Sequence, residues 1–89
     1  MEYGKYIIVE ELGHEVAIMF NSLITHADFT ELYHSKYIKA AGFFVVDTEY
    51  DEIERKSAIT VSVWGKSVTL KLESRKEDVK LIKDVIDPF

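Results

Sequence analysis

The sequence contains no cysteine among its 89 residues, so disulfide bonds, thiol nucleophiles and thiolate metal ligands are excluded. No apolar run approaches the roughly 20 residues that a membrane-spanning helix requires, and we expect no membrane partner. Glycine is scarce, and its four occurrences are scattered singly, so no glycine-rich loop is available to bind a phosphate group. These absences remove several common kinds of enzyme and cofactor site.

An excess of basic residues is missing as well. The chain has 16 acidic and 11 basic residues, which gives a formal net charge of −5. An acidic chain repels phosphate groups at long range, so non-specific binding to nucleic acid is disfavoured. The hydrophobic fraction of 47% is that of a folded globular protein, and the length predicts a single domain over residues 1–89. Acidic residues stand near the N-terminus where a secretory signal would carry basic ones, so we expect a cytoplasmic location.

Alternation of apolar and polar residues predicts β-strands in the first half of the chain. Residues 5–20 are expected to form a β-hairpin that turns at Gly13 and His14, because glycine supplies the positive φ that a tight turn needs. Residues 37–47 are the most apolar run and predict a central strand covered on both faces. Since two helices cover one face of a sheet more readily than both, a partner chain is one candidate for the second cover.

The second half of the chain shows the same alternation. Residues 48–56 are rich in charge and predict a loop. Residues 57–72 alternate regularly on either side of Gly65 and Lys66, which predicts a second β-hairpin turning at that pair.

Two helices are expected, each with a capping box at its start. Thr25 with Asp28, and Ser74 with Glu77, have the spacing at which a side-chain oxygen and a carboxylate bind reciprocal backbone N–H groups. The first helix would dock through Phe29, Leu32 and Tyr33. The second would place on one face Val79, Leu81, Ile82, Val85 and Ile86. The predicted fold is therefore α+β with the order β-β-α-β-β-β-α, a mostly antiparallel sheet of about five strands with two packed helices.

The histidines and serines do not form a recognisable catalytic or metal site. His26 and His34 are eight residues apart, which is about 12 Å along a straight helix, whereas a zinc ion needs both nitrogens near 2 Å. None of the serines lies in a nucleophile-elbow sequence. We therefore expect no catalytic residue, no metal and no cofactor, and the protein is predicted not to be an enzyme. Whether His26 is covered by the sheet or exposed stays open at this point.

The acidic run "DTEYDEIE" is the first candidate binding site. Its opening resembles an EF-hand loop, but the sixth position is Glu52 instead of glycine, and the twelfth is Ala58 instead of glutamate. The run is either a solvated loop or a patch that binds a basic partner, with Tyr50 and Ile53 as apolar contacts. Trp64 falls out of register with its apolar neighbours and either covers the sheet or joins an interface. The predicted protein-binding residues are Asp47, Glu49, Tyr50, Asp51, Glu52 and Trp64.

The start of the last helix is the second candidate. Residues 26–87 taken alone are predicted to run α-β-β-β-α, and with the lysines of "SRKEDVKLIK" this order resembles the double-stranded-RNA-binding domain, which contacts phosphates there. The short first helix, the two extra leading strands, and the acids Glu77, Asp78 and Asp84 depart from that family. The residues this resemblance implies for nucleic acid are Arg75, Lys76, Lys80 and Lys83.

The function expected from the sequence is that of a small non-catalytic protein-interaction domain, adaptor or regulatory in kind. Its expected partner is another protein, with a homodimer as one form. A nucleic-acid-binding module that uses the basic face of the last helix is the alternative.

Overall fold

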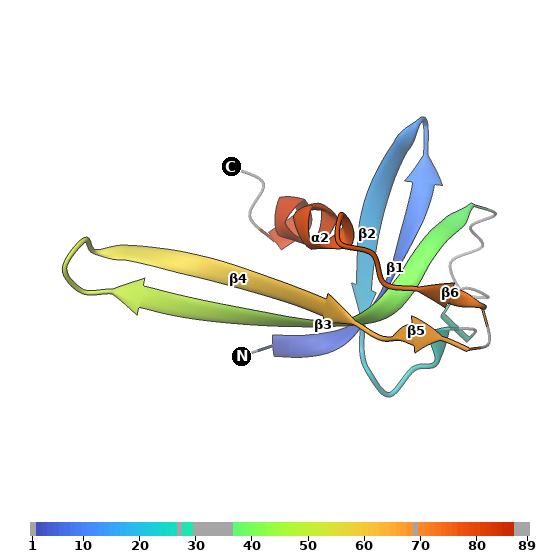
Figure 1. Cartoon of the computed structure of the whole chain (residues 1–89), viewed down its shortest axis with the longest axis horizontal. Coiled ribbons are helices and arrows are strands. Elements are labelled where there is room, and N and C mark those ends of the chain that lie inside the picture. Colours follow the sequence, from blue (N-terminus) through green and yellow to red (C-terminus); the bar gives the residue numbers. More distant parts are fainter. Residues whose placement is uncertain (1, 27, 30–36, 69, 87–89) are drawn as a thin grey trace.

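The computed structural model describes residues 2–26, 28–29, 37–68 and 70–86. Its main element is a four-stranded antiparallel sheet in the order β2-β1-β3-β4 (Figure 1). The strands of this sheet are β1 (Glu2–Glu11), β2 (His14–Phe20), β3 (Ile38–Asp51) and β4 (Lys56–Trp64). A separate two-stranded pair and one helix complete the described elements, namely β5 (Lys66–Ser67), β6 (Leu72–Glu73) and α2 (Asp78–Ile86). The α+β class and the mostly antiparallel sheet are confirmed.

The predicted first hairpin is confirmed, with its turn one residue earlier than expected. Strands β1 and β2 pair without interruption up to Glu11 and His14, which leaves Leu12 and Gly13 as the two turn residues. Both have positive φ, 52° and 81°, which a two-residue type I′ turn requires at both positions. Leu12 therefore takes a backbone conformation that glycine would adopt at lower cost, and its side chain is fully exposed.

The predicted second hairpin over residues 57–72 is wrong. Strand β4 pairs along its whole length with β3, from Lys56 opposite Asp51 to Trp64 opposite Phe43. Residues 48–56, expected to be a loop, are largely strand, with only residues 52–55 forming the turn. The physical reason is local to that turn: the Asp51 carboxylate accepts hydrogen bonds from the Ile53 and Glu54 N–H groups at 2.9 and 3.3 Å, which fixes a tight turn without glycine.

One face of the sheet packs against α2. Ile82 is fully buried there, and Val79, Leu81 and Ile86 pack beside it. Val85, expected on the same apolar face, is 47% exposed. The strand residues in this cluster are Tyr6, Ile8, Ala17, Ala40, Phe44, Val46 and Val61.

The opposite face of the sheet is covered by the chain itself. Ile7, Val9 and Ala41 are fully buried on this side. Their cover comes from β2, from the segment at Phe29 and from the β5–β6 region, through Ile18, Phe20, Phe29, Ile38, Leu70 and Leu72. The second face of the apolar run 37–47 therefore has a cover within the chain, and the partner chain considered as one candidate for that cover is not needed there.

Both predicted helix starts are found, one of them shifted. The Thr25 hydroxyl accepts a hydrogen bond from the Asp28 N–H at 3.0 Å, and the Phe29 N–H donates to the Thr25 carbonyl, so a helical turn begins there. Leu32, Tyr33 and His34 lie outside the described residues, so two packed helices are not confirmed. At the second start the carboxylate that reaches back belongs to Asp78, not Glu77, and binds the Arg75 N–H at 2.8 Å. Within the described ranges, neither α2 nor the turn at Thr25 is long and apolar enough to cross a bilayer.

Candidate functional site

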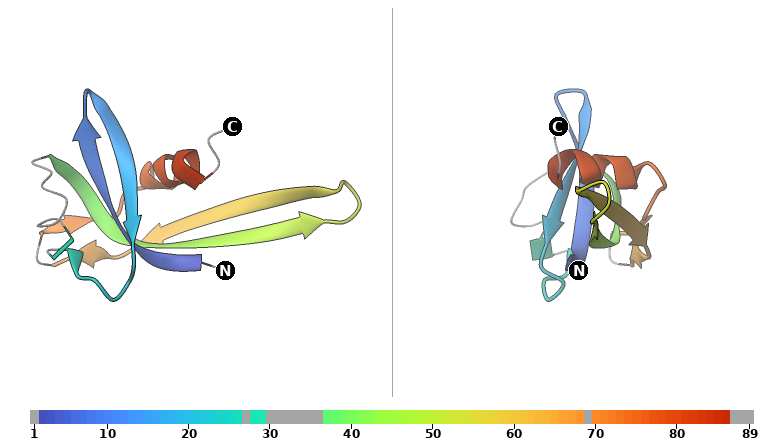
Figure 2. Two further views of the ribbon diagram at one scale, coloured as in Figure 1. Left: turned by 180° about the vertical axis from the view of Figure 1, so that it is seen from behind. Right: turned by 90° about the vertical axis from the view of Figure 1, so that its left-hand side faces the viewer.

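The β3–β4 hairpin projects beyond the rest of the sheet (Figure 2). Strand β1 follows β3 only as far as Val46, which lies opposite Glu2. Beyond that point, within the described ranges, β4 is the only strand that pairs with β3. We call residues 47–60 the arm, and within it every residue from 48 to 58 is exposed. The arm is thus a regularly paired two-stranded ribbon whose outer part has no packed face, an arrangement that is only marginally stable by itself.

The two faces of the arm differ in chemistry. Because every second residue of a strand points to the same face, Asp47, Glu49 and Asp51 of β3 all lie on one face, which we call the acidic face. The other face carries Tyr50 and Ile59 and continues the apolar surface that α2 covers closer to the body. Tyr50 is 61% exposed.

The predicted protein-binding residues therefore do not form one patch. Three of the acids share the acidic face, Tyr50 lies on the opposite face, and Glu52 lies in the turn beside Ile53, which is 93% exposed. Trp64 is at the far end of β4, eight residues from Lys56, or about 26 Å at roughly 3.3 Å per residue.

Trp64 covers a neighbouring ring at the base of the arm. Its ring stacks on Phe43 with centroids 6.0 Å apart and an interplanar angle of 21°, and the residue remains 49% exposed. Gly65 follows with a φ of 79°, and a Cβ there would lie 2.7 Å from the Phe43 ring. The alternation of the sequence placed Trp64 on the polar side of the strand, but the contact with Phe43 depends on the β3–β4 register, which sequence reasoning missed.

A groove runs between β4 and α2. Its volume is about 420 Å³, and it is lined by Val61, Ser62, Val63, Ser74, Arg75, Lys76 and Val79. Strand β4 forms one wall of the groove and is also the edge of the sheet. Sequence reasoning missed this groove because it depends on where α2 crosses the sheet. The available signal was the uncharged stretch from Ser57 to Trp64.

A buried polar cluster fixes the start of α2. Asp78 is fully buried and accepts hydrogen bonds from the Tyr6 hydroxyl at 2.6 Å and from the Arg75 Nε at 2.9 Å. Arg75 also binds Glu15 of β2 at 2.6 Å. Burial, and then the hydrogen bond to Asp78, raise the pKa of the Tyr6 hydroxyl far above its ordinary value, so it stays protonated and donates. Although partial burial lowers the pKa of Arg75, hydrogen bonds to Glu15 and Asp78 raise it overall.

This cluster bears on the residues considered for nucleic acid. Arg75 binds three carboxylates, those of Glu15, Glu77 and Asp78, and is therefore engaged in holding the helix on the sheet. Lys80 and Lys83 are exposed on α2, and Lys76 is exposed in the turn that precedes it. The element order that carried the resemblance to the double-stranded-RNA-binding domain is not found, because β5 and β6 pair with each other outside the main sheet. The nucleic-acid alternative stays a prediction from the sequence alone.

His26 is a core residue. It is 6% exposed, and its Nε2 lies 2.9 Å from the Gly42 carbonyl oxygen. The rings of Phe20 and Phe43 meet it edge-on, with centroids 5.4 and 5.8 Å away. Burial, more than the nearby charge of Lys5, lowers the pKa of His26, so the neutral imidazole donates from Nε2 to the Gly42 carbonyl. Across the part of the chain that the structure describes, no three His, Asp or Glu side chains gather into a potential metal site.

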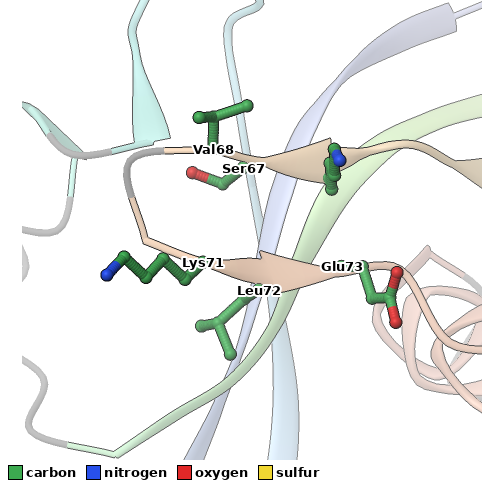
Figure 3. Close-up of a pocket in the computed structure, with 6 residues that line it drawn as sticks. Ser67, Val68, Lys71, Leu72 and Glu73 are labelled. Carbon is green, nitrogen blue, oxygen red and sulfur yellow. The ribbon is translucent and has the colours of Figure 1, made fainter.

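A second pocket, of about 320 Å³, lies along β5 and β6 (Figure 3). Its lining includes Ser67, Lys71 and Glu73, the residue types that an acid–base site would need. In Figure 3, however, the side chains of Lys71 and Glu73 point away from each other, and the Ser67 hydroxyl oxygen accepts a hydrogen bond from the Leu70 N–H at 3.3 Å. These groups do not converge on a common point, which is what general acid–base chemistry would need.

Comparison of the chain with protein-family models, with curated proteins and with solved structures finds no match in any of the three.

Proposed function

We propose that the protein is a small, non-catalytic interaction domain that binds another protein through the arm. The observation that carries this proposal is the exposure of every residue from 48 to 58 in a strand pair that keeps a regular register. If these residues formed an irregular loop, their exposure would need no explanation beyond the solvation of charged side chains. An ordered ribbon that projects from the sheet presents fixed side chains, which is what recognition needs.

The two faces of the arm would contribute different parts of the binding energy. Tyr50 and Ile53 expose most of their surface, and burying apolar surface is worth about 25 cal/mol per Å². Tyrosine is also one of the residue types that dominate interface energetics. The carboxylates of the acidic face would raise the association rate with a basic partner more than the affinity. The partner chemistry that fits is therefore an apolar surface bordered by cations.

The test is capture of partners from an extract of the cells that make the protein. A Tyr50→Ser/Ile53→Ser variant should lose the partners that the wild type retains, because it removes the exposed apolar surface of the arm. Leu12→Ser is the matched control, since Leu12 is fully exposed at the other hairpin turn. The proposal is contradicted when the arm variant captures the same proteins as the wild type. Equal thermal unfolding of the three proteins shows that the fold is unchanged.

A further inference from the structure

We infer that β4 pairs antiparallel with β4 of a second copy, which joins the two four-stranded sheets into one continuous sheet. This inference rests on the proposed function, because it names the partner of the arm. Three independent features of the structure support it: an unprotected sheet edge, a groove that fits the exposed side chains of the arm, and a complementary distribution of charge.

The edge formed by β4 lacks the usual features that prevent pairing. Natural edge strands carry charges, proline, bulges or a covering segment. Apart from Lys56 at its first position, β4 has no charged residue, no proline and no glycine, and its register with β3 has no bulge. No backbone hydrogen bond from another described segment reaches β4 on its outer side. The opposite edge, β2, differs because Glu15 near its start is held by Arg75.

The symmetry of the pair allows only those registers in which one residue of β4 lies opposite the same residue of the other copy. Two copies of an edge strand that pair antiparallel are related by a two-fold axis perpendicular to the sheet, so each face of one copy continues as the same face of the other. Residues opposite each other share a face, so one residue must lie opposite its own copy. Pairing over the whole of β4, from Lys56 to Trp64, puts Thr60 at that centre.

This register brings the partly buried Ile59 and the exposed Ser57 and Tyr50 of the arm to the groove. Ile59 of the second copy lies beside Val61 of the first, and Ser57 lies beside Val63. Tyr50 is the cross-strand neighbour of Ser57, so it lies on the same face of the joined sheet, one strand farther from the groove. The groove wall on this face is apolar, with Val61, Val63 and Val79. The apolar face of each arm would thus be covered by the groove of the other copy.

The charges also match. Antiparallel pairing places the turn of each arm at the base of β4 in the other copy. This turn carries three acids, Asp51, Glu52 and Glu54, against the two basic residues Arg55 and Lys56, so acids are in excess there. Lys66 follows that base directly, and Lys76 lines the groove beside it. Neither lysine forms an ion pair with another residue in the described ranges.

The first experiment measures the mass of the purified protein in solution by sedimentation equilibrium. The wild type should approach twice the chain mass of 10.3 kDa with increasing concentration. Thr60→Lys should shift the equilibrium to monomer by at least about tenfold in Kd, because it sets two like charges opposite each other at the axis. Leu12→Lys is the matched control: the same charge added at the fully exposed turn of the other hairpin should leave the dimer intact. A wild type that stays monomeric at its highest soluble concentration overturns the inference.

The second experiment locates the contact by cross-linking. Because the chain has no cysteine, Thr60→Cys introduces a single reactive thiol, and a short bismaleimide should join two copies through it. Thr48→Cys should stay uncross-linked under the same conditions. Cross-linking of Thr48→Cys in preference to Thr60→Cys would place the contact on the β3 edge of the arm and overturn the β4 pairing.

A charge exchange tests the predicted register. Glu52→Lys/Glu54→Lys and Lys66→Glu/Lys76→Glu should each dimerise more weakly than the wild type, because like charges then meet. A mixture of the two variants should form a heterodimer of near wild-type affinity, since opposite charges meet again at both ends. No recovery on mixing would contradict the register.

These results separate the inference from the proposed function. A monomeric wild type whose capture of another protein depends on Tyr50 and Ile53 overturns β4 pairing and leaves the proposed function standing. A monomeric wild type that captures the same proteins as the Tyr50→Ser/Ile53→Ser variant overturns both the β4 pairing and the proposed function. A dimer that Thr60→Lys dissociates supports the pairing whatever the extract contains.

Discussion

The body of the sheet and the arm share two strands but place them in opposite environments. In the body, Ala40 and Ala41 of β3 are fully buried, because α2 covers one face and the β5–β6 region the other. From Thr48 onwards the same strand is exposed. The pairing with β4 nevertheless continues without a change of register. Regular strand pairing in this chain therefore does not require burial, so the exposed part of the hairpin is available for another purpose.

The largest effect is expected in the polar cluster of the body. Asp78→Ala leaves the Tyr6 hydroxyl unpaired beneath α2 and removes one of the three carboxylates that Arg75 binds. Leaving a buried hydroxyl unpaired costs about 1–3 kcal/mol of unfolding free energy, and the lost hydrogen bonds to a charged acceptor are worth about 1.5–3 kcal/mol each. Asp51→Ala, which removes the acceptor at the turn of the arm, should cost about 1 kcal/mol. Urea unfolding of both variants measures the difference, and equal losses would contradict a division between body and arm.

The same comparison can be made with a single apolar substitution. Ile82→Ala in α2 creates a cavity at a fully buried site and should cost about 2–5 kcal/mol. Ile53→Ala at the turn of the arm removes the same atoms from a side chain that is 93% exposed, and should stay within about 0.5 kcal/mol. Chemical denaturation of the monomeric Thr60→Lys background keeps dimer formation out of the measurement. A loss above about 1 kcal/mol for Ile53→Ala would show that the arm packs on the body.

The sequence predicts the body better than the arm, for a physical reason. In residues 5–20 the alternation and the glycine turn agree, so the first hairpin follows from local pattern alone. In residues 57–72 an equally regular alternation surrounds Gly65, yet β4 pairs with β3, because the turn at residues 52–55, held by the Asp51 carboxylate, joins those two strands instead. The charges of residues 48–56 indicated a loop, although Thr48 and Tyr50 alternate with Glu49 and Asp51 as an exposed strand would.

The candidate site is less predictable still. The acids and Tyr50 can be named from the sequence, but their division between two faces follows only from the register. The groove and the cluster around Asp78 each combine residues from separate elements. From the sequence alone Asp78 is an acid that interrupts a row of lysines, because nothing in the local sequence indicates that Tyr6, 72 residues away, donates a hydrogen bond to it.

At the junction between body and arm, adding a methyl group at Gly65 should reduce the stability of the protein. Gly65→Ala has two costs. An alanine held at positive φ loses about 1–2 kcal/mol, and its Cβ would lie only 2.7 Å from the Phe43 ring. Gly13→Ala has a similar φ of 81° but nothing within 4 Å of the added Cβ, so it meets the first cost alone. We expect the larger loss for Gly65→Ala, together with a change in fluorescence from Trp64, the single tryptophan. Equal losses of stability in the two variants would mean that the Phe43 and Trp64 rings move to accommodate the added Cβ at no cost in free energy.

The smallest predicted effect is a pH dependence confined to the body. Burial lowers the pKa of His26 below its ordinary value of 6.5, so the unfolded chain binds a proton at a higher pH than the folded one. The contribution of the neutral imidazole is therefore fully present above about pH 6.5 and is progressively lost as the pH falls through that value towards the folded pKa. His26→Gln keeps a side-chain donor for the Gly42 carbonyl but cannot be protonated, so its unfolding midpoint should fall less between about pH 7 and 5 than that of the wild type. The arm variants Tyr50→Ser and Ile53→Ser should lose stability over this range in the same way as the wild type, because both residues lie far from His26 in the exposed part of the arm. If His26→Gln and the wild type lose stability in parallel over this range, protons bind elsewhere in the body, and His26 does not set its pH dependence.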